Sequence, residues 1–220
     1  MNLPNKLTIF RIILVPIIML VYAFEPLRNQ AVLYPALSMS NFIILILFIV
    51  GSVTDFLDGN IARRKGLVTD FGKFLDPVAD KLLVFSVLLI LMDQCSYYEL
   101  KTGESYVLIE WWMIVILLTR EFLVTALRLV AASKGKVLAA VWHGKLKTVL
   151  QMLTIIIALA GCAVVRVNGE YNLLSNRMGY VVFVQILVYL MLVVTIFSGA
   201  DYLIKNKEVF LDTKPYKKKR

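Results

Sequence analysis

Four aspartates stand out as residues whose type and spacing suit them for chemistry. They are Asp55, Asp58, Asp76 and Asp80. On helices, residues three or four positions apart lie on one face, so each pair would present its two carboxyl groups together. Strongly apolar segments flank the group, and an ionised carboxylate inside a membrane costs about 2.5–3.5 kcal/mol on insertion scales. Four carboxylates gathered there therefore require a cation.

A divalent metal ion is the cation that such a site selects. Mg²⁺ and Mn²⁺ prefer carboxylate oxygens, keep coordination positions open for water, and commonly hold substrate phosphates against the protein. A short turn between the two helices would bring all four aspartates to the same place. We therefore expect the aspartates to bind Mg²⁺ or Mn²⁺, as two ions.

Small residues beside the aspartates indicate what the metal would serve. Gly59 and Ala62 follow the first pair along the same helical face, and Gly72 lies one turn before the second pair. Without large side chains, the backbone leaves room for a flat or phosphorylated ligand to approach closely. Arg63 adds a planar guanidinium that binds phosphate through two donors. The combination predicts a pyrophosphate site with room for a nucleotide.

These residues form one pattern, which reads Asp55-xx-Asp58-Gly59-xx-Ala62-Arg63-x8-Gly72-xxx-Asp76-xxx-Asp80. The pattern resembles the signature of the CDP-alcohol phosphotransferases, integral membrane enzymes that displace CMP from a CDP-linked lipid or alcohol. Eight fixed residues at fixed spacing make the match specific for the family, although not for the acceptor alcohol. The resemblance implies that the first three aspartates are metal ligands and that Asp80 is both a ligand and the general base. It also implies a homodimer.

The first residues, MNLPNKLTIFR, carry a second resemblance. They are similar to the NLPNxLTxxR opening of the phosphatidylglycerophosphate synthases of bacteria, a branch of the same family, which implies that Asn5, Thr8 and Arg11 lie near the nucleotide. Without that resemblance, the segment is equally well explained as a helix cap and an arginine that reaches the interface. The apolar run that follows lacks a small-x-small cleavage site, so we expect an interfacial turn and a retained first span.

Composition places the chain among membrane proteins. It has 220 residues, of which 60% are hydrophobic, and a mean hydropathy of +0.78. Soluble domains are about 45–50% apolar on a wider count. No linker, low-complexity tract or internal repeat divides the chain, so residues 1–220 are expected to form one domain.

The apolar segments predict an all-α integral membrane protein with six transmembrane helices. After the interfacial segment and the first span, the remaining spans are expected at 40–64, 72–93, 107–132, 147–164 and 180–203. Polar residues with Pro or Gly indicate exterior loops at 25–38, 94–106 and 165–177. Cys95 and Cys162 both fall toward the exterior ends of spans. The sequence does not decide whether they form a disulfide, since two cysteines without others are weak evidence for one.

The distribution of positive charge predicts the orientation. Of 24 Lys and Arg residues, 17 fall on one side of this arrangement and 4 on the other. Because cytoplasmic segments carry the excess of Lys and Arg, both termini are expected in the cytoplasm, and the aspartates are expected to face the cytosol. The resemblance to the bacterial synthases implies that the membrane is the inner membrane of a bacterium. The net charge of +9 is explained by topology and anionic ligands, since no groove or reading helix suggests nucleic acid.

Cations near the inner ends of spans four and five suggest where the acceptor binds. Arg120 and Arg128 are eight positions apart, so they share nearly the same helical face. Lys136, Lys145 and Lys147 lie in stretches that resemble the GK and GKxKT segments of the same synthases, which favours a pocket for the phosphate of the acceptor. The alternative is that the lysines belong to a polybasic cytoplasmic loop. In that case Arg120 would only pair with a carboxylate and hold helices together. His143 is expected to be a solvated loop residue.

The resemblance implies a complete reaction. Glycerol 3-phosphate would attack the β-phosphorus of CDP-diacylglycerol, forming a phosphodiester and expelling CMP. Inositol phosphate or another alcohol would use the same chemistry. A divalent-cation transporter would also place carboxylates on facing helices, but its polar path should cross the membrane, whereas the outer halves of spans two and three read FIILILFIV and LLVFSVLLIL.

Overall fold

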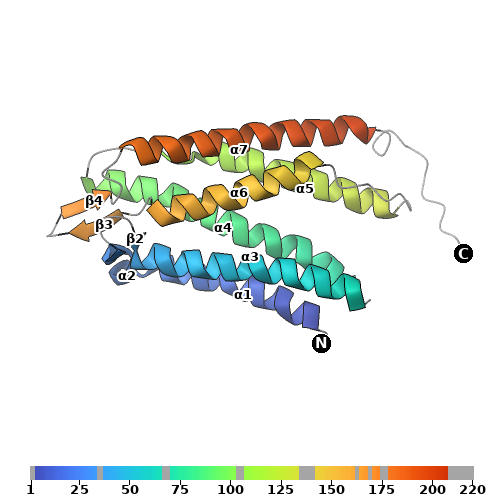
Figure 1. The fold of residues 1–220 in the computed structure, drawn as a ribbon, viewed down its shortest axis with the longest axis horizontal. Helices are drawn as coiled ribbons and strands as arrows, with labels where there is room; N and C mark the ends of the chain where they lie inside the picture. The colour runs from blue at the N-terminus through green and yellow to red at the C-terminus, as the bar shows by residue number, and fades with distance from the viewer. Residues whose placement is uncertain are drawn as a thin grey trace, which may run out of the picture.

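Six long helices lie side by side along the long axis of the molecule (Figure 1). The computed structural model describes residues 3–33, 37–65, 70–102, 107–133, 142–161, 164–167, 170–173 and 178–207. The long helices are α1 (Leu3–Ala23), α3 (Met39–Lys65), α4 (Asp70–Thr102), α5 (Trp111–Ser133), α6 (Trp142–Gly161) and α7 (Met178–Lys205), and a short helix, α2 (Glu25–Asn29), follows α1.

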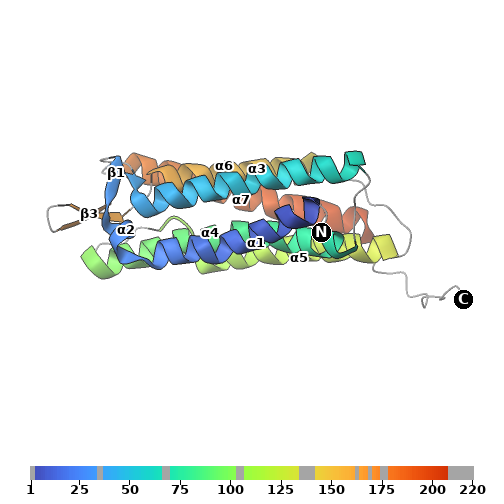
Figure 2. The ribbon, with the colours of Figure 1, turned by 90° about the horizontal axis from the view of Figure 1, so that it is seen from below.

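Two short β-hairpins lie with α2 at one end of the helices (Figures 1 and 2). The first pairs β1 (Ala31–Leu33) with β2 (Leu37–Ser38), and the second pairs β3 (Val164–Val167) with β4 (Glu170–Leu173), both antiparallel. The sequence predicted loops at 25–38 and 165–177. Hairpins form instead because antiparallel pairing satisfies backbone N–H and C=O groups that a loop would leave to solvent.

The opposite end of the molecule holds the start of α1, the end of α3, the start of α4 and the end of α7 (Figure 1). The first and last helices thus begin and end on the same side. The end of α5 and the start of α6 lie there too. This is the side on which the sequence placed its aspartates and most of its lysines.

The helix boundaries test the predicted spans directly. Helices α3 and α7 match the segments 40–64 and 180–203 closely. The loop predicted from residue 94 is wrong up to residue 102, because α4 continues through this stretch, which contains no Gly or Pro before Gly103. Helix α6 begins at Trp142, before the predicted residue 147, and α1 is one continuous helix from Leu3 in place of a separate interfacial turn.

Apolar side chains on the outside of the bundle identify its solvent as lipid. Within the described part of the chain, three helices are long and apolar enough to cross a membrane, namely Asn5–Ala23, Trp142–Gly161 and Gly179–Lys205. Large apolar residues such as Leu20, Val193 and Phe197 are exposed on them. A soluble protein rarely exposes so continuous an apolar surface, so the chain is a membrane protein.

The interior is apolar along most of its length. Each of five helices contributes a fully buried side chain to one cluster: Phe48 from α3, Leu88 from α4, Leu117 from α5, Ile155 from α6 and Met191 from α7. Helix α1 packs on α3 and α4, whereas α7 packs on α5 and α6. Contacts of α4 with α5 and α6 join these two groups, which is where acidic and basic residues from distant parts of the chain can meet.

Near the hairpins, buried amides tie three helices together. Asn41 Nδ2 on α3 donates to the carbonyl oxygen of Leu159 on α6 at 3.3 Å, and Gln94 Nε2 on α4 donates to Asn41 Oδ1 at 2.5 Å. These bonds explain why α4 stays ordered past residue 93, since Gln94 is buried and needs a partner. Cys95 is buried beside it, with its Sγ donating to the Leu91 carbonyl oxygen, whereas Cys162 lies outside the described residues.

Candidate functional site

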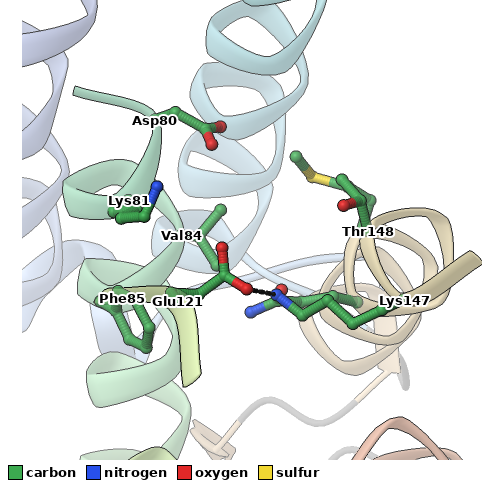
Figure 3. A pocket seen from close by; sticks show the side chains of 9 residues that line it. Asp80, Lys81, Val84, Phe85, Glu121, Lys147 and Thr148 are labelled. Atoms are coloured by element: carbon green, nitrogen blue, oxygen red, sulfur yellow. Dashed lines mark hydrogen bonds and ion pairs between the residues drawn. The ribbon is translucent and has the colours of Figure 1, made fainter. Parts of the chain in front are cut away.

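One pocket lies where α4, α5 and α6 meet (Figure 3). Most of the residues that line it are polar or charged, although the helices around it are apolar. The lining residues are Asp80, Lys81, Val84, Phe85, Glu121, Lys147, Thr148, Gln151 and Met152. Charged groups inside a helix bundle are expensive to keep, so their presence points to a function.

Asp80 presents a carboxylate to this pocket from the first half of α4. In Figure 3 it points toward the space above the pair formed by Glu121 and Lys147. It makes no hydrogen bond or ion pair with another residue of the described ranges, and it lies within the electrostatic influence of Asp55 and Glu121 as well as of Lys81 and Arg11. The adjacent Lys81 turns its Nζ to the carbonyl oxygen of Pro77, at 3.2 Å. A half-buried carboxylate without a hydrogen-bond partner in the described part of the chain is available to a ligand or a proton.

Asp55 approaches the same region from α3. Its carboxylate forms an ion pair with Arg11 of α1, whose side chain is 0% exposed, while Asp55 itself stays 42% exposed. Arg11 therefore holds one oxygen of Asp55 from the buried side and leaves the carboxylate open on the other. The predicted nucleotide residues Asn5 and Thr8 are buried on the preceding turns of α1.

The other two aspartates lie on the same pair of helices. Asp58 is one turn after Asp55 on α3, and Asp76 is one turn before Asp80 on α4, and these helices contact each other. The side chains of both lie outside the described part, as do the surroundings of Gly59, Ala62, Arg63 and Gly72. The groups that are described include no cluster of three metal ligands.

The acidic set suits a hard divalent cation. Two described carboxylates, Asp55 and Asp80, repel each other, and the helix register adds two more on adjacent turns. The Arg11 guanidinium pairs with only one of them. Carboxylate oxygens are the donor set that Mg²⁺ or Mn²⁺ selects.

Glu121 organises the basic side of the pocket. Its Oε1 accepts hydrogen bonds from Arg120 Nη1 at 2.6 Å and from Lys147 Nζ at 2.8 Å. The sequence alone assigned Glu121 no role. The available signal was a carboxylate next to an arginine inside an apolar span, since such charges are paired when they are buried.

Arg120 is held by a third helix as well. Its Nη2 donates to Ser198 Oγ of α7 at 2.6 Å. Gly199 makes room for this side chain, because a Cβ at that position would lie 2.8 Å from Arg120 Cγ. Arg120 Nε is buried and has no hydrogen-bond partner among the described residues, so the guanidinium keeps a donor available.

Among the described residues, the other predicted cations, Arg128 and Lys145, do not line this pocket. Arg128 Nε donates to Tyr202 Oη at 3.3 Å, and its guanidinium carbon lies 5.6 Å from the centre of the Tyr202 ring. Lys145 is exposed on α6, and Lys136 lies outside the described residues. His143, expected in a solvated loop, lies on α6 with its ring 5.5 Å from that of Phe197. Of the five predicted phosphate ligands, Arg120 and Lys147 are the two that share one carboxylate.

Comparison with known proteins gives a consistent result. Residues 1–197 match the family model described as CDP-alcohol phosphatidyltransferase. A protein of Bacillus subtilis (strain 168), named CDP-diacylglycerol–glycerol-3-phosphate 3-phosphatidyltransferase, is 38% identical over 94% of this chain and 96% of the relative. Proteins with the same name from Rickettsia bellii (strain RML369-C) and Haemophilus influenzae are each 33% identical. The first covers 95% of this chain and 97% of the relative, and the second covers 96% of both.

The Glu121 contacts predict a characteristic stability pattern. Glu121→Gln leaves Lys147, whose side chain is 3% exposed, without a negative partner. Breaking a buried pair on one side costs about 3–5 kcal/mol, so the thermal midpoint in detergent should fall strongly. Glu121→Gln combined with Lys147→Gln should recover part of that loss, because no unpaired ammonium remains. Losses that simply add in the double variant would contradict the pairing.

Proposed function

We propose that this chain, which belongs to the CDP-alcohol phosphatidyltransferase family, transfers the phosphatidyl group of CDP-diacylglycerol to glycerol 3-phosphate. The products are phosphatidylglycerophosphate and CMP. One observation carries the proposal beyond the family: the carboxylate of Asp80, which has no hydrogen-bond partner among the described residues, lines the same pocket as Glu121 and Lys147, and Glu121 also binds Arg120. The names of the relatives support the choice of substrates.

The four aspartates would hold divalent metal, Mg²⁺ or Mn²⁺, in two positions. Asp55, Asp58 and Asp76 act as ligands, and Asp80 acts both as a ligand and as the base. When bound, the metal neutralises charge on the pyrophosphate and on the departing CMP. The ion pair with Arg11 supports this role for Asp55, because it fixes the side chain from one side and leaves the other side exposed.

Asp80 takes the proton from the reacting hydroxyl of glycerol 3-phosphate. The hydroxyl oxygen then forms a bond to the β-phosphorus of CDP-diacylglycerol, and the bond from that phosphorus to the bridging oxygen breaks, so CMP leaves with the electron pair. Arg120 and Lys147 bind the phosphate of the acceptor through charge-assisted hydrogen bonds. Lys136, Lys145 and Arg128 remain candidate contributors to acceptor binding.

The nucleotide-linked lipid would bind along α1, α3 and α4. Asn5 and Thr8 face it from α1, where both are buried in the part of the helix that leads to Arg11. The other predicted contacts come from α3 and from the start of α4: Gly59, Ala62, Arg63 and Gly72. The two acyl chains stay in the bilayer.

The arrangement of the helices supports six spans with both termini in the cytoplasm. The long helices number six in the described part, and the first begins at the end of the molecule where the last one ends (Figure 1). The pocket lies toward that same end, in the first half of α4 and of α6. The chain would thus meet its water-soluble substrate from the cytosol. The family resemblance adds that it would lie in the inner membrane of a bacterium as a homodimer.

The proposal is tested by measuring CMP release from CDP-diacylglycerol with a panel of alcohols. The purified protein should release CMP with glycerol 3-phosphate and not with serine, and inositol phosphate should be a poor acceptor. Robust CMP release with inositol phosphate alone would mean that inositol phosphate, and not glycerol 3-phosphate, is the acceptor. No CMP release with any alcohol would overturn the assignment of the protein as an enzyme.

Chelation in the same assay examines the metal. Excess EDTA should abolish CMP release, because uncompensated carboxylates repel the pyrophosphate, and added Mg²⁺ or Mn²⁺ should restore it. Full activity in EDTA, with no metal found by elemental analysis of the protein, would exclude the metal site.

The Asp80→Asn variant tests whether Asp80 acts as the general base or only as a metal ligand. General-base catalysis contributes about 10²- to 10⁴-fold, so turnover should fall at least about a hundredfold while CDP-diacylglycerol binding is largely kept. Single-turnover kinetics with a separate binding measurement would show the difference. Near-normal turnover with weakened lipid binding would make Asp80 a ligand only.

The variants Arg120→Gln and Arg128→Gln together test which arginine binds the phosphate of the acceptor. Loss of a charge-assisted bond costs about 1.5–3 kcal/mol, so Arg120→Gln should lower kcat/KM for glycerol 3-phosphate about tenfold or more. Arg128→Gln should have a smaller effect, because its guanidinium lies against Tyr202. Equal losses would place both arginines at the phosphate, and unchanged acceptor kinetics in a stable Arg120→Gln protein would remove it from the site.

A further inference from the structure

Gln151 is a buried polar residue of the pocket to which the proposed reaction gives no role. It lies on α6 one turn beyond Lys147, is 4% exposed, and lines the space shared with Asp80. Its Nε2 nitrogen has no hydrogen-bond partner among the described residues. A buried donor without a partner destabilises a fold, so a retained one indicates that a ligand completes it.

A neighbouring polar residue on the same helix behaves differently. Thr154 is also buried, three positions after Gln151, but its hydroxyl donates to the carbonyl oxygen of Leu150 at 2.8 Å. Thr154 does not line the pocket, whereas Gln151 does. The helix therefore satisfies a buried hydroxyl within itself, whereas the Gln151 Nε2 that borders the pocket has no partner in the described part of the chain.

The position of Gln151 identifies the group it can bind. Residues four apart on a helix have Cβ atoms about 5–6 Å apart on one face, so Gln151 lies next to Lys147. If Lys147 and Arg120 bind the phosphate of a three-carbon acceptor and Asp80 meets its reacting hydroxyl, one polar group remains, on the middle carbon. That group is a neutral hydroxyl, which both donates and accepts, and a neutral amide matches it better than it matches a phosphate.

We propose that Gln151 is a specificity-determining residue, which donates a hydrogen bond from Nε2 to the middle hydroxyl of a short polyol phosphate. The inference rests on the proposed function and names the part of the acceptor that the pocket recognises. A site built to pair a substrate hydroxyl discriminates against an analogue that lacks it, because the buried polar group is then left unpaired.

The test compares two acceptors in two proteins. Glycerol 3-phosphate and 3-hydroxypropyl phosphate share the phosphate and a primary hydroxyl, but the second lacks the middle hydroxyl. The wild type should prefer glycerol 3-phosphate. Gln151→Met, which keeps a similar length, should lower kcat/KM for glycerol 3-phosphate about threefold to tenfold and leave the value for 3-hydroxypropyl phosphate nearly unchanged.

The decisive quantity is the change in the ratio of the two kcat/KM values. Differences in intrinsic reactivity between the acceptors cancel in this ratio, as in a double-mutant cycle. Thr154→Val is the matched control: it removes a buried polar group of α6 outside the pocket, so it should leave the ratio unchanged. A ratio that Gln151→Met shifts and Thr154→Val does not would support the proposal.

Two results would overturn it. Equal losses with both acceptors would mean that Gln151 braces the pocket or binds water, and a loss confined to the KM for CDP-diacylglycerol would place it on the nucleotide side. If Gln151→Met does not fold, Gln151→Asn shortens the amide by one methylene and is judged by the same ratio. Failure of the proposed function would be visible separately, as a wild-type protein that releases CMP with neither phosphate.

Discussion

The pocket depends on one carboxylate oxygen. Arg120 and Lys147 are largely removed from solvent, and a buried charge costs several kcal/mol unless an opposite charge pairs it. Glu121 Oε1 accepts hydrogen bonds from both cations and so connects α5 to α6, and the Arg120–Ser198 bond extends the connection to α7. Because one negative charge meets two positive ones, the group keeps a net positive charge. It is therefore stable enough to persist and still attracts an anion.

The opposite half of the bundle has the opposite imbalance. On α1 and α3, the buried Arg11 pairs with Asp55, and α3 and α4 also carry the other three aspartates of the motif, Asp58, Asp76 and Asp80. In the proposed function, this acidic side would attract a divalent metal, and the basic side would attract a phosphate. The two halves touch where α4 packs on α5 and α6. A reaction between a metal-bound pyrophosphate and a phosphorylated alcohol needs this juxtaposition of unlike excess charges.

Local features of the sequence were sufficient to predict the family and part of the fold. The resemblance of the aspartate motif to a known signature predicted the family, which is confirmed, and the apolar segments predicted α3 and α7 within a few residues. What could not be predicted depends on contacts between distant helices. The continuation of α4 past residue 93 requires Asn41 of α3 as a partner for Gln94. The different surroundings of Arg120 and Arg128 require Ser198 and Tyr202 of α7, because eight positions along one helix suggest only a common face.

The roles of Glu121 and Gln151 could not be predicted from the sequence for a related reason. Each is a common polar residue in an apolar helix, and nothing in its own segment tells whether it faces lipid, another helix or a cavity. The fold distinguishes them: Glu121 is paired with two cations, and Gln151 Nε2 has no hydrogen-bond partner among the residues that the structure describes. A polar residue whose hydrogen-bond partners all come from the protein helps to build the site. A polar residue that lacks a protein partner can instead bind a ligand that enters the site.

The apolar interior beyond the pocket separates chemistry at one surface from passage across the membrane. Between Asp80 and Gln94 the buried side chains of α4 are apolar except Ser86, whose hydroxyl donates to the Leu82 carbonyl oxygen of its own helix. A cation leaving the aspartates toward the hairpins would meet Leu88, Phe48 and Ile155, none of which offers an oxygen ligand. Transport needs polar groups on both sides of the binding site. Carboxylates that end against an apolar core can hold a metal for a reaction at the membrane surface, where a lipid headgroup and a soluble alcohol phosphate meet.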